Sequence, residues 1–354
     1  MNKSFLFLLF GFIVGALLFT IGCTSSSSNY QSTHLTGVIW GTTYNITYNP
    51  GSSRLSTVDA TSLVDMAIDK IDSVANAFNP QSEIARLNEW GRLECPSETF
   101  LTLLNYSGQI YEKTGGAFDP TVGPLVNMWG FGAERPIPNP NTAQVDSVLA
   151  LVGFEKVIFN TDSISFSSGG MRLDLAAIAK GAGVDAVADA FQANGVEDYM
   201  IEIGGEVRVH GDNPQGRPWT IQIDAPVADT TVTHRRLCII ELNDAAVATS
   251  GNYRNFIRDA SGRLLYHTVS PTTGQPVQND ILSATVIAKS TMVADAFATA
   301  CMVLGLQSAV KLIEELRTVE NLEIYGAIFV TPKEDSFIIH PVGLVPEHVI
   351  IREN

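Results

Sequence analysis

Basic residues are scarce in this sequence. Its 354 residues include 22 Lys and Arg against 37 Asp and Glu, which gives a net charge of −15 at pH 7. No run of Lys or Arg interrupts this acidic background. Because nucleic-acid binding depends on clustered cations that neutralise phosphates, we expect no nucleic-acid partner. An anionic ligand would have to be held by local devices, such as a metal ion, a helix end or a few amines.

Cysteine is also rare. Besides Cys23, the chain has Cys95, Cys238 and Cys301, whose wide spacing matches neither a zinc motif nor a disulfide framework. Tandem repeats are absent as well. The chain is still long enough to bury a sizeable core, as one large domain or two.

The N-terminal residues predict where the protein is located. Lys3 precedes an apolar run over 5–19, and Gly22-Cys23 resembles a lipobox, so we expect residues 1–22 to be a lipoprotein signal peptide and Cys23 to be lipidated. Ordinary signal cleavage beside an incidental cysteine is the alternative. The Ser-rich residues 23–36 predict a flexible tether, and 37–354 the folded domain. We therefore expect an exported protein anchored to a membrane, taken as the inner one, and facing the periplasm or cell exterior.

Hydrophobic periodicity predicts an α+β fold with mainly antiparallel sheets, because strand patterns outnumber helical ones and hairpins are frequent. The expected strands include 38–48, 199–211 and 219–226 with a turn between them, 237–248, 324–330 and 336–341. The expected helices include 58–78, a short one capped by Ser82, 100–114, one ending near 192, 291–304 and 307–318.

The stretch 169–183, GGMRLDLAAIAKGAG, places Asp174 and Lys180 among small residues at the start of a helix. Small side chains allow close approach of a ligand, and a helix N-terminus favours anions. Tight helix packing with a salt-bridged pair explains the pattern equally well.

A second informative helix is expected over 291–304, with Ser290 as its cap. Asp295 and Thr299 are one helical turn apart on one face, where two hard oxygen ligands suit Mg²⁺ or Ca²⁺. The alternative is an Asp favoured by the helix dipole and a Thr bonded back to a carbonyl.

Other candidates are weaker. Asp119 could bind a ligand or simply close a turn. Phe118, Trp40 and Phe78 could form an aromatic wall or belong to the core. His267 lies beside a rigid turn that could aim it at a site. The glycine pair in IEIGGEVRV could serve a site or a strand bulge.

Taken in order, the motifs GGAFDPTVGPL, GGMRLDLAAIAKGAGVD, IEIGGEVRVHG, ATSGNYRNF, YHTVSPTTGQPV and TMVADAFATACMVLG resemble those of ApbE-type FAD:protein FMN transferases. GTTYNITY and FNPQSEIARLN also fit, so the resemblance spans about residues 37–343. It implies an ApbE-like, T-fold-related single domain of two lobes.

The resemblance also implies roles for individual residues. Asp295, Thr299 and the carbonyl of Ala177 match magnesium ligands, and His267 and Asp295 are the catalytic candidates. Trp40 stands where the family has Met, and Ala176 and Ala177 where Gly or Ser is frequent. The positions that match FAD-contacting residues are Trp40, Phe78, Ala117, Phe118, Asp119, Asp174, Lys180 and Val269.

The implied reaction is the Mg²⁺-dependent transfer of the FMN half of FAD to a Thr or Ser hydroxyl of an acceptor protein, with release of AMP. The implied acceptors are flavin-carrying subunits of membrane redox complexes. Two alternatives stay open: an FAD pyrophosphatase that uses water in place of the hydroxyl, and a non-catalytic FAD-binding lipoprotein.

Overall fold

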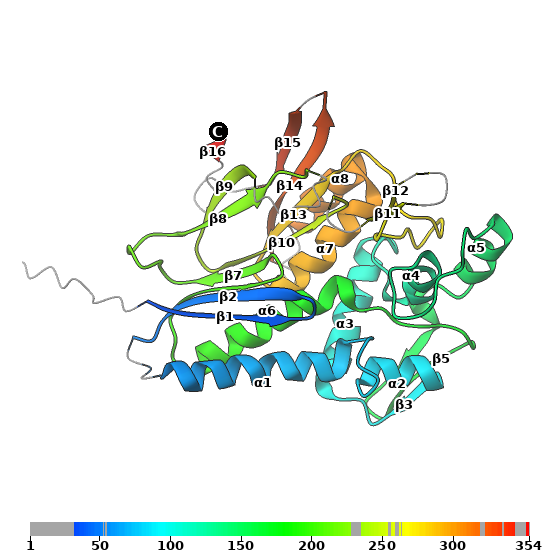
Figure 1. Ribbon diagram of the computed structural model, residues 1–354, viewed down its shortest axis with the longest axis horizontal. Coiled ribbons are helices and arrows are strands. Elements are labelled where there is room, and N and C mark those ends of the chain that lie inside the picture. The colour runs from blue at the N-terminus through cyan, green and yellow to red at the C-terminus, as the bar shows by residue number, and fades with distance from the viewer. Residues whose placement is uncertain are drawn as a thin grey trace, which may run out of the picture. The chain divides into compact units, whose positions relative to one another are not determined.

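The computed structural model describes residues 32–343 except 52, 54, 228–234, 254–255, 259–261, 263, 319–322 and 335, together with 352–353 (Figure 1). The predicted signal peptide, Cys23 and most of the predicted tether lie outside the described residues. The first strand begins at Thr33, so residues 33–36, which we expected in the tether, pair within a sheet.

One eight-stranded sheet organises the fold, and every neighbouring pair of strands in it is antiparallel. This confirms the α+β class. In spatial order the strands are β1 (Thr33–Ile39), β2 (Thr42–Asn49), β6 (Asp198–Ile203), β7 (Glu206–His210), β10 (Ala245–Gly251), β13 (Ser283–Ala288), β14 (Ile324–Lys333) and β15 (Ser336–Val342).

The single strand predicted over 38–48 is wrong, because the chain reverses in the middle of it. Trp40 and Gly41 have φ angles of 49° and 74°, and Ile39 pairs with Thr42 across the turn. Two successive residues with positive φ are typical of the tight turns that match strand twist. The β-branched and aromatic residues on both sides of the turn favoured one continuous strand, although Gly41 is a turn signal.

The strand predicted over 237–248 is likewise two strands, and they belong to different sheets. β9 (Arg236–Leu242) lies in a three-stranded sheet, whereas β10 lies in the eight-stranded one. Asp244, with φ at 48°, breaks the extended backbone between them. Aspartate tolerates this conformation better than most residues do.

The predicted helices form, and a further short helix spans Gly123–Trp129, in a Pro- and Gly-containing stretch that was expected to be irregular. The predicted caps are confirmed at Ser82 and Ser290, whose side chains accept hydrogen bonds from the N–H groups of Ala85 and Val293. The helices are α1 (Thr57–Ala75), α2 (Glu83–Trp90), α3 (Glu98–Lys113), α4 (Gly123–Trp129), α5 (Thr142–Leu149), α6 (Ala176–Ala193), α7 (Thr291–Leu304) and α8 (Leu306–Leu316).

The large sheet is covered on both faces. Helices α1 and α6 pack on β1, β2 and β6 through one apolar cluster, and α7 packs on β10 and β13 (Figure 1). On the opposite face lie β8 (Trp219–Asp224) and β9, whose apolar residues meet those of β7, β10 and β13. Consequently all six residues of β13 are buried. β16 (Arg352–Glu353) completes the three-stranded sheet.

Smaller elements flank this core. β3 (Arg92–Glu94), β5 (Ser163–Phe166) and β4 (Val157–Phe159) form a second three-stranded sheet, and β11 (Phe256–Arg258) pairs with β12 (Leu264–Tyr266). Short 3₁₀ turns span Pro120–Val122 and Phe154–Lys156. Within the described part of the chain, no helix is long and apolar enough to cross a membrane.

Candidate functional site

The contact between α6 and α7 is the centre of the candidate site. A Cβ atom on Gly181 of α6 would lie 2.4 Å from the carbonyl oxygen of Thr291 in the first turn of α7. Only glycine therefore permits this approach of two backbones. The small residues of the 169–183 stretch do serve tight packing, and the same packing brings charged groups together.

The two helices run in opposite directions past this contact. Asp185, one turn after Gly181 on α6, accepts hydrogen bonds from the Thr291 and Met292 N–H groups at 3.0 and 2.9 Å and thus caps the start of α7. Gly181 donates its own N–H to Asp295, one turn further along α7, at 3.0 Å. One more turn in each helix brings Ala177 level with Thr299.

Lys180 joins two buried carboxylates beside this contact. Its Nζ lies 3.3 Å from Oδ1 of Asp295 and 3.2 Å from Oε1 of Glu206. The whole residues Asp295 and Glu206 are only 2 and 3 % exposed, whereas the Lys180 side chain is partly open to solvent. The structure thus brings together two residues that the sequence pointed to and one, Glu206, that it did not.

Burial sets the electrostatics of this cluster. Burial raises the pKa of Glu206 to about 8, against the opposing effect of Lys180. The pKa of Asp295 is also raised by burial, although Lys180 and the Gly181 N–H favour its charged form. Burial alone would lower the pKa of Lys180, but the attraction of Asp295 and Glu206 raises it above its ordinary value. With all three ionised, the cluster carries one surplus negative charge.

Glu206 reaches α6 because of a tight turn. Gly204 and Gly205, both with positive φ, connect β6 to β7, and Ile203 pairs directly with Glu206. The glycine pair is therefore a hairpin turn and not a strand bulge. Since paired residues project to the same face of a sheet, Glu206 follows buried Ile203 towards the helices.

A second ion pair from the same strand fixes the register of α6. Arg208, two residues after Glu206, donates from Nη1 to Oδ1 of Asp185 at 2.6 Å. Lys180 with Glu206 and Asp185 with Arg208 are thus two oppositely arranged ion pairs between one helix and one strand. A shift of α6 along β7 would break both.

Asp295 and Thr299 do lie on one face of α7. Thr299 is half-buried in a helix whose first eight residues are all buried, and its hydroxyl hydrogen-bonds the Ser250 hydroxyl of β10 at 3.0 Å. Asp295 lies in the second turn of α7, bonded to α6. The helix-dipole explanation of Asp295 therefore does not hold, since the dipole acts on the first turn.

The carbonyl of Ala177 belongs to the first turn of α6. In a regular helix its position is level with the N–H four residues later, which is that of Gly181. This N–H also donates to Oδ2 of Asp295 at 3.0 Å. Ala177 therefore lies one turn before the point where α6 is bonded to Asp295 of α7.

Asp174 lies where the chain enters α6. Its N–H donates to the Pro120 carbonyl at 2.7 Å, and its carboxylate accepts from the Ala176 N–H at 2.8 Å. Burial raises the pKa of Asp174. Asn88 of α2 holds the preceding residue, Leu173, by accepting from its N–H at 2.7 Å and donating to its carbonyl at 2.8 Å. This contact explains why the ARLN motif accompanies the stretch 169–183.

Asp119 closes a turn next to Asp174. Its carboxylate accepts from the N–H and the hydroxyl of Thr121 at 2.8 and 2.6 Å. Burial raises the pKa of Asp119 to about 6, although the bonds from Thr121 oppose the rise. The neighbouring Ala117 and Phe118 are buried, and the Phe118 ring belongs to the main apolar core. Any contact of this segment with a ligand falls to its backbone and to Asp119.

Trp40 and Phe78, the other two aromatic candidates, are both positioned through Asp72. Trp40 stacks its ring over Gly183 of α6 and donates from Nε1 to Asp72 at 2.9 Å. Asp72 also accepts from the side chains of Asn76 and Asn79, which bracket the loop carrying Phe78. Phe78 is 71 % exposed, so of the three aromatic residues it has the ring most open to a planar ligand.

His267 begins a loop that is docked on α4 and α5. The indole N–H of Trp129 donates to the Gly274 carbonyl at 2.7 Å, and Val269 is buried in the apolar cluster formed there. The His267 ring lies edge-on to Phe131, with ring centroids 6.4 Å apart. The turn after His267 is therefore held firmly, as the Pro- and Gly-rich sequence predicted.

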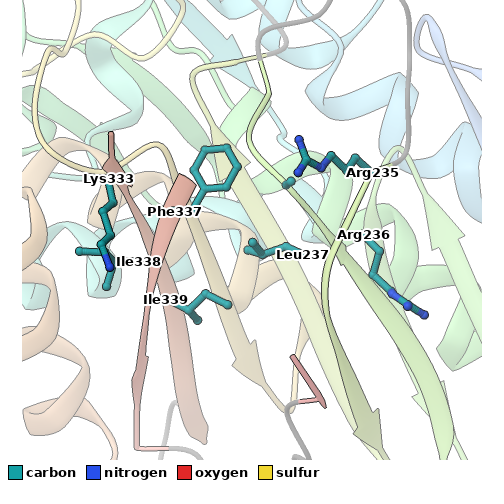
Figure 2. Close-up of a pocket in the computed structure, with 8 residues that line it drawn as sticks. Arg235, Arg236, Leu237, Lys333, Phe337, Ile338 and Ile339 are labelled. Atoms are coloured by element: carbon teal, nitrogen blue, oxygen red, sulfur yellow. The ribbon is translucent and has the colours of Figure 1, made fainter. Parts of the chain in front are cut away.

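A cavity of about 470 Å³ lies elsewhere, between β9 and β15 (Figure 2). Its lining combines the cations Arg235, Arg236 and Lys333 with apolar residues that include Phe337 and Ile338. None of the predicted site residues lines it. The residues of the Lys180, Asp295 and Glu206 cluster are therefore not part of this groove.

The match to a known protein family covers the part of the chain that contains the site. The family model described as "ApbE family" matches residues 40–323, from the Trp40 turn to the start of β14. The chain belongs to the ApbE family. All of the site residues discussed above lie within the matched region, and Asp295 and Thr299 lie in its final part.

Relatives from the ApbE family match most of the chain. The FAD:protein FMN transferase of Vibrio cholerae is 38 % identical over 297 residues, which cover 82 % of this chain and 86 % of that protein. The Haemophilus influenzae FAD:protein FMN transferase is 33 % identical, with 93 % of this chain and 97 % of that protein covered. The structure of the Vibrio cholerae flavin transferase ApbE matches with a TM-score of 0.77 at 33 % identity, covering 90 % of this chain and 99 % of that one.

Four residues with clear structural roles were absent from the sequence prediction. Glu206 pairs with Lys180, Asp185 caps α7, Asp72 anchors the aromatic loop and Asn88 holds the entry to α6. Only Glu206 had a readable signal, since strand parity across the Gly-Gly turn places it on the face of Ile203. The other three act through contacts that only the folded chain creates.

Proposed function

We propose that this chain transfers the FMN moiety of FAD to a Thr or Ser hydroxyl of an acceptor protein and releases AMP. Its membership of the ApbE family and the names of its relatives, FAD:protein FMN transferases, support this assignment. The observation that carries it is the buried Asp295 beside Thr299, facing Lys180 and the first turn of α6.

The donor set at α6 and α7 fits Mg²⁺. Asp295, the Thr299 hydroxyl and the Ala177 carbonyl are all hard oxygen donors, which magnesium prefers. Among the residues that the structure describes, no group of three or more His, Cys, Asp or Glu could hold a metal, so carbonyl and hydroxyl oxygens would have to complete this site. When bound, Mg²⁺ would polarise the pyrophosphate of FAD.

The chain's own residues have separate tasks in this reaction. The acceptor oxygen forms a bond to the phosphorus of the FMN half, the pyrophosphate P–O bond breaks, and the phosphate of AMP takes the electron pair. Lys180 supplies a positive charge beside the site. We assign the hydroxyl proton to His267, because Asp295 is already engaged by Lys180 and the Gly181 N–H. Phe78 and Trp40 would bind the flavin ring, with Asp119 and Asp174 at the entry to α6.

The test is incubation of the pure protein with FAD, Mg²⁺ and a flavin-carrying subunit of a membrane redox complex. Mass spectrometry of the acceptor should show an FMN-sized addition on Thr or Ser, with equal release of AMP. Asp295→Ala should abolish this transfer in a folded protein, whereas Asp146→Ala, at an exposed position of α5, should not alter it. FMN and AMP without acceptor labelling would identify a pyrophosphatase, and tight FAD binding without turnover a binding protein.

We propose in addition that Cys23 is lipidated and anchors the enzyme to a membrane, where it faces the periplasm or the cell exterior. The support is the apolar run over 5–19 followed by Gly22-Cys23. Cys23→Ser should move the protein from the membrane fraction to the soluble fraction while its activity in solution persists. Retention in the membrane after this substitution would contradict the lipid anchor.

A further inference from the structure

Glu206 is a buried carboxylate with one oxygen that accepts no hydrogen bond from the described residues. Its Oε1 binds Lys180 at 3.2 Å, but its Oε2 has no hydrogen-bond partner among the described residues although it is fully buried. Leaving a buried carboxylate oxygen unpartnered is costly, so the retention of Glu206 calls for a reason. The chain offers it one cation, and this cation is shared with Asp295.

Lys180 and a divalent cation would compete for Asp295. Lys180 contacts both oxygens of Asp295, at 3.3 and 3.4 Å, and the Gly181 N–H takes a further position on Oδ2. A metal ion held by Asp295, Thr299 and Ala177 would repel the ammonium of Lys180. Among the described residues, Glu206 of β7 has no hydrogen bond to α7. Its carboxylate is the second one, besides that of Asp295, in contact with Lys180.

We propose that Lys180 is the internal counter-ion of Asp295 in the metal-free protein, and that Glu206 holds Lys180 beside the site when a divalent cation takes Asp295. Glu206 is thus a positioning residue that acts through Lys180. The proposal rests on the proposed function, because it places the metal at Asp295. It adds that Lys180 gives up its contact with Asp295 on metal binding and keeps its contact with Glu206.

The geometry of β7 supports this role. The Gly204-Gly205 turn and the pairing of Ile203 with Glu206 fix where the carboxylate begins. The ion pair of Arg208 with Asp185 then fixes α6 against the same strand. The strand that carries Glu206 and the helix that carries Lys180 are therefore joined by a second ion pair besides their own.

The test is a double-mutant cycle of metal affinity in the FAD-free protein, with Mn²⁺ as the probe and free Mn²⁺ measured by electron paramagnetic resonance. The variants are Glu206→Gln, Lys180→Met and the double substitution. We expect Lys180→Met to bind Mn²⁺ about tenfold more tightly, because it removes the competing ammonium. Glu206→Gln should bind about tenfold more weakly, because Lys180 then pairs with Asp295 alone.

The double variant distinguishes an effect of Glu206 through Lys180 from a direct effect on the metal. If Glu206 acts through Lys180, the weakening caused by Glu206→Gln should shrink to less than about threefold once Lys180 is absent. An equal weakening in both backgrounds would show that Glu206 acts directly on the metal and would overturn the proposal. Weaker binding by Lys180→Met, or no Mn²⁺ uptake by the unaltered protein, would overturn it as well.

Controls separate folding and function from this inference. If Lys180→Met does not fold, Lys180→Gln keeps a polar group and replaces it in the cycle. Glu206→Asp, which keeps the charge but shortens the reach, should weaken Mn²⁺ binding less than Glu206→Gln does. FMN transfer without the expected coupling would refute the role of Glu206 alone, whereas coupling without transfer would refute the proposed function alone.

Discussion

Replacing Gly181 by Ala tests whether the contact of α6 with α7 sets the geometry of the site. The added methyl carbon would lie 2.4 Å from the Thr291 carbonyl oxygen, 2.6 Å from its carbon and 2.7 Å from the Met292 Cα. These atoms are all backbone, so no side chain can rotate away. Because ordinary contacts begin near 3.4 Å, the two helices must separate by about 1 Å.

The expected loss of stability follows from three contributions. Overpacking costs about 1–3 kcal/mol, and weakening the bond from the Gly181 N–H to the charged Asp295 costs about 1.5–3 kcal/mol. Alanine returns about 1 kcal/mol because it is the better helix former. We therefore expect the free energy of unfolding to fall by about 1.5–5 kcal/mol, and transfer to fall about 100-fold because a shift of this size misplaces Asp295.

Urea unfolding followed by tryptophan fluorescence measures the first effect, and the rate of FMN transfer measures the second. Gly169→Ala is the matched control, because a Cβ there meets nothing within 4 Å, and it should behave like the unaltered protein. Gly183→Ala meets only the Trp40 ring, a side chain that can move, so its effect should be intermediate. A Gly181→Ala protein with unaltered stability and activity would refute the reasoning.

Two further predictions concern buried charges. Burial raises the pKa of Asp119 from 3.8 to about 6, so its contribution to stability is largest below pH 4 and is lost as pH rises through 6. Asp119→Asn, which keeps an acceptor for Thr121, should therefore gain stability relative to the unaltered protein as pH rises from 3 to 8, by up to about 3 kcal/mol in urea unfolding, with about half of the gain reached near pH 5; an equal difference at pH 3 and pH 8 would contradict this. Asp185→Asn removes the ion-pair partner of Arg208 and should cost about 2–4 kcal/mol, part of which Arg208→Met in the same chain should restore; additive losses would count against the ion pair.

Elements specified by neighbouring residues were predictable from the sequence. Helix α7 is an example, because Ser290 supplies its cap, Gly305 its end and an unbroken apolar run its buried surface. Two strand errors arose where a residue other than glycine adopts positive φ, at Trp40 and at Asp244. Gly41 and the pair Asn243-Asp244 are turn signals beside these positions, and the strand predictions did not take them into account.

The candidate site was predictable only in its local parts. Asp295 and Thr299 share a helical face by spacing alone, and Lys180 stands near a predicted helix start. Their meeting depends on the packing of α6 against α7, which brings together residues 115 positions apart. Glu206 reaches the same place from a third element, and no local pattern links it to either helix. The resemblance to a known family supplied what periodicity could not.

The charged cluster between α6, α7 and β7 also has a consequence for how this protein tolerates heat. Buried ion pairs are commonly matched or exceeded in stability by apolar residues of similar volume, and the unpartnered Oε2 of Glu206 strengthens that comparison here. A library screened for thermal resistance alone would therefore accumulate apolar replacements at Lys180, Glu206 and Asp295. A library screened for flavin transfer would retain all three, so at this point in the fold heat tolerance and catalysis select opposite sequences.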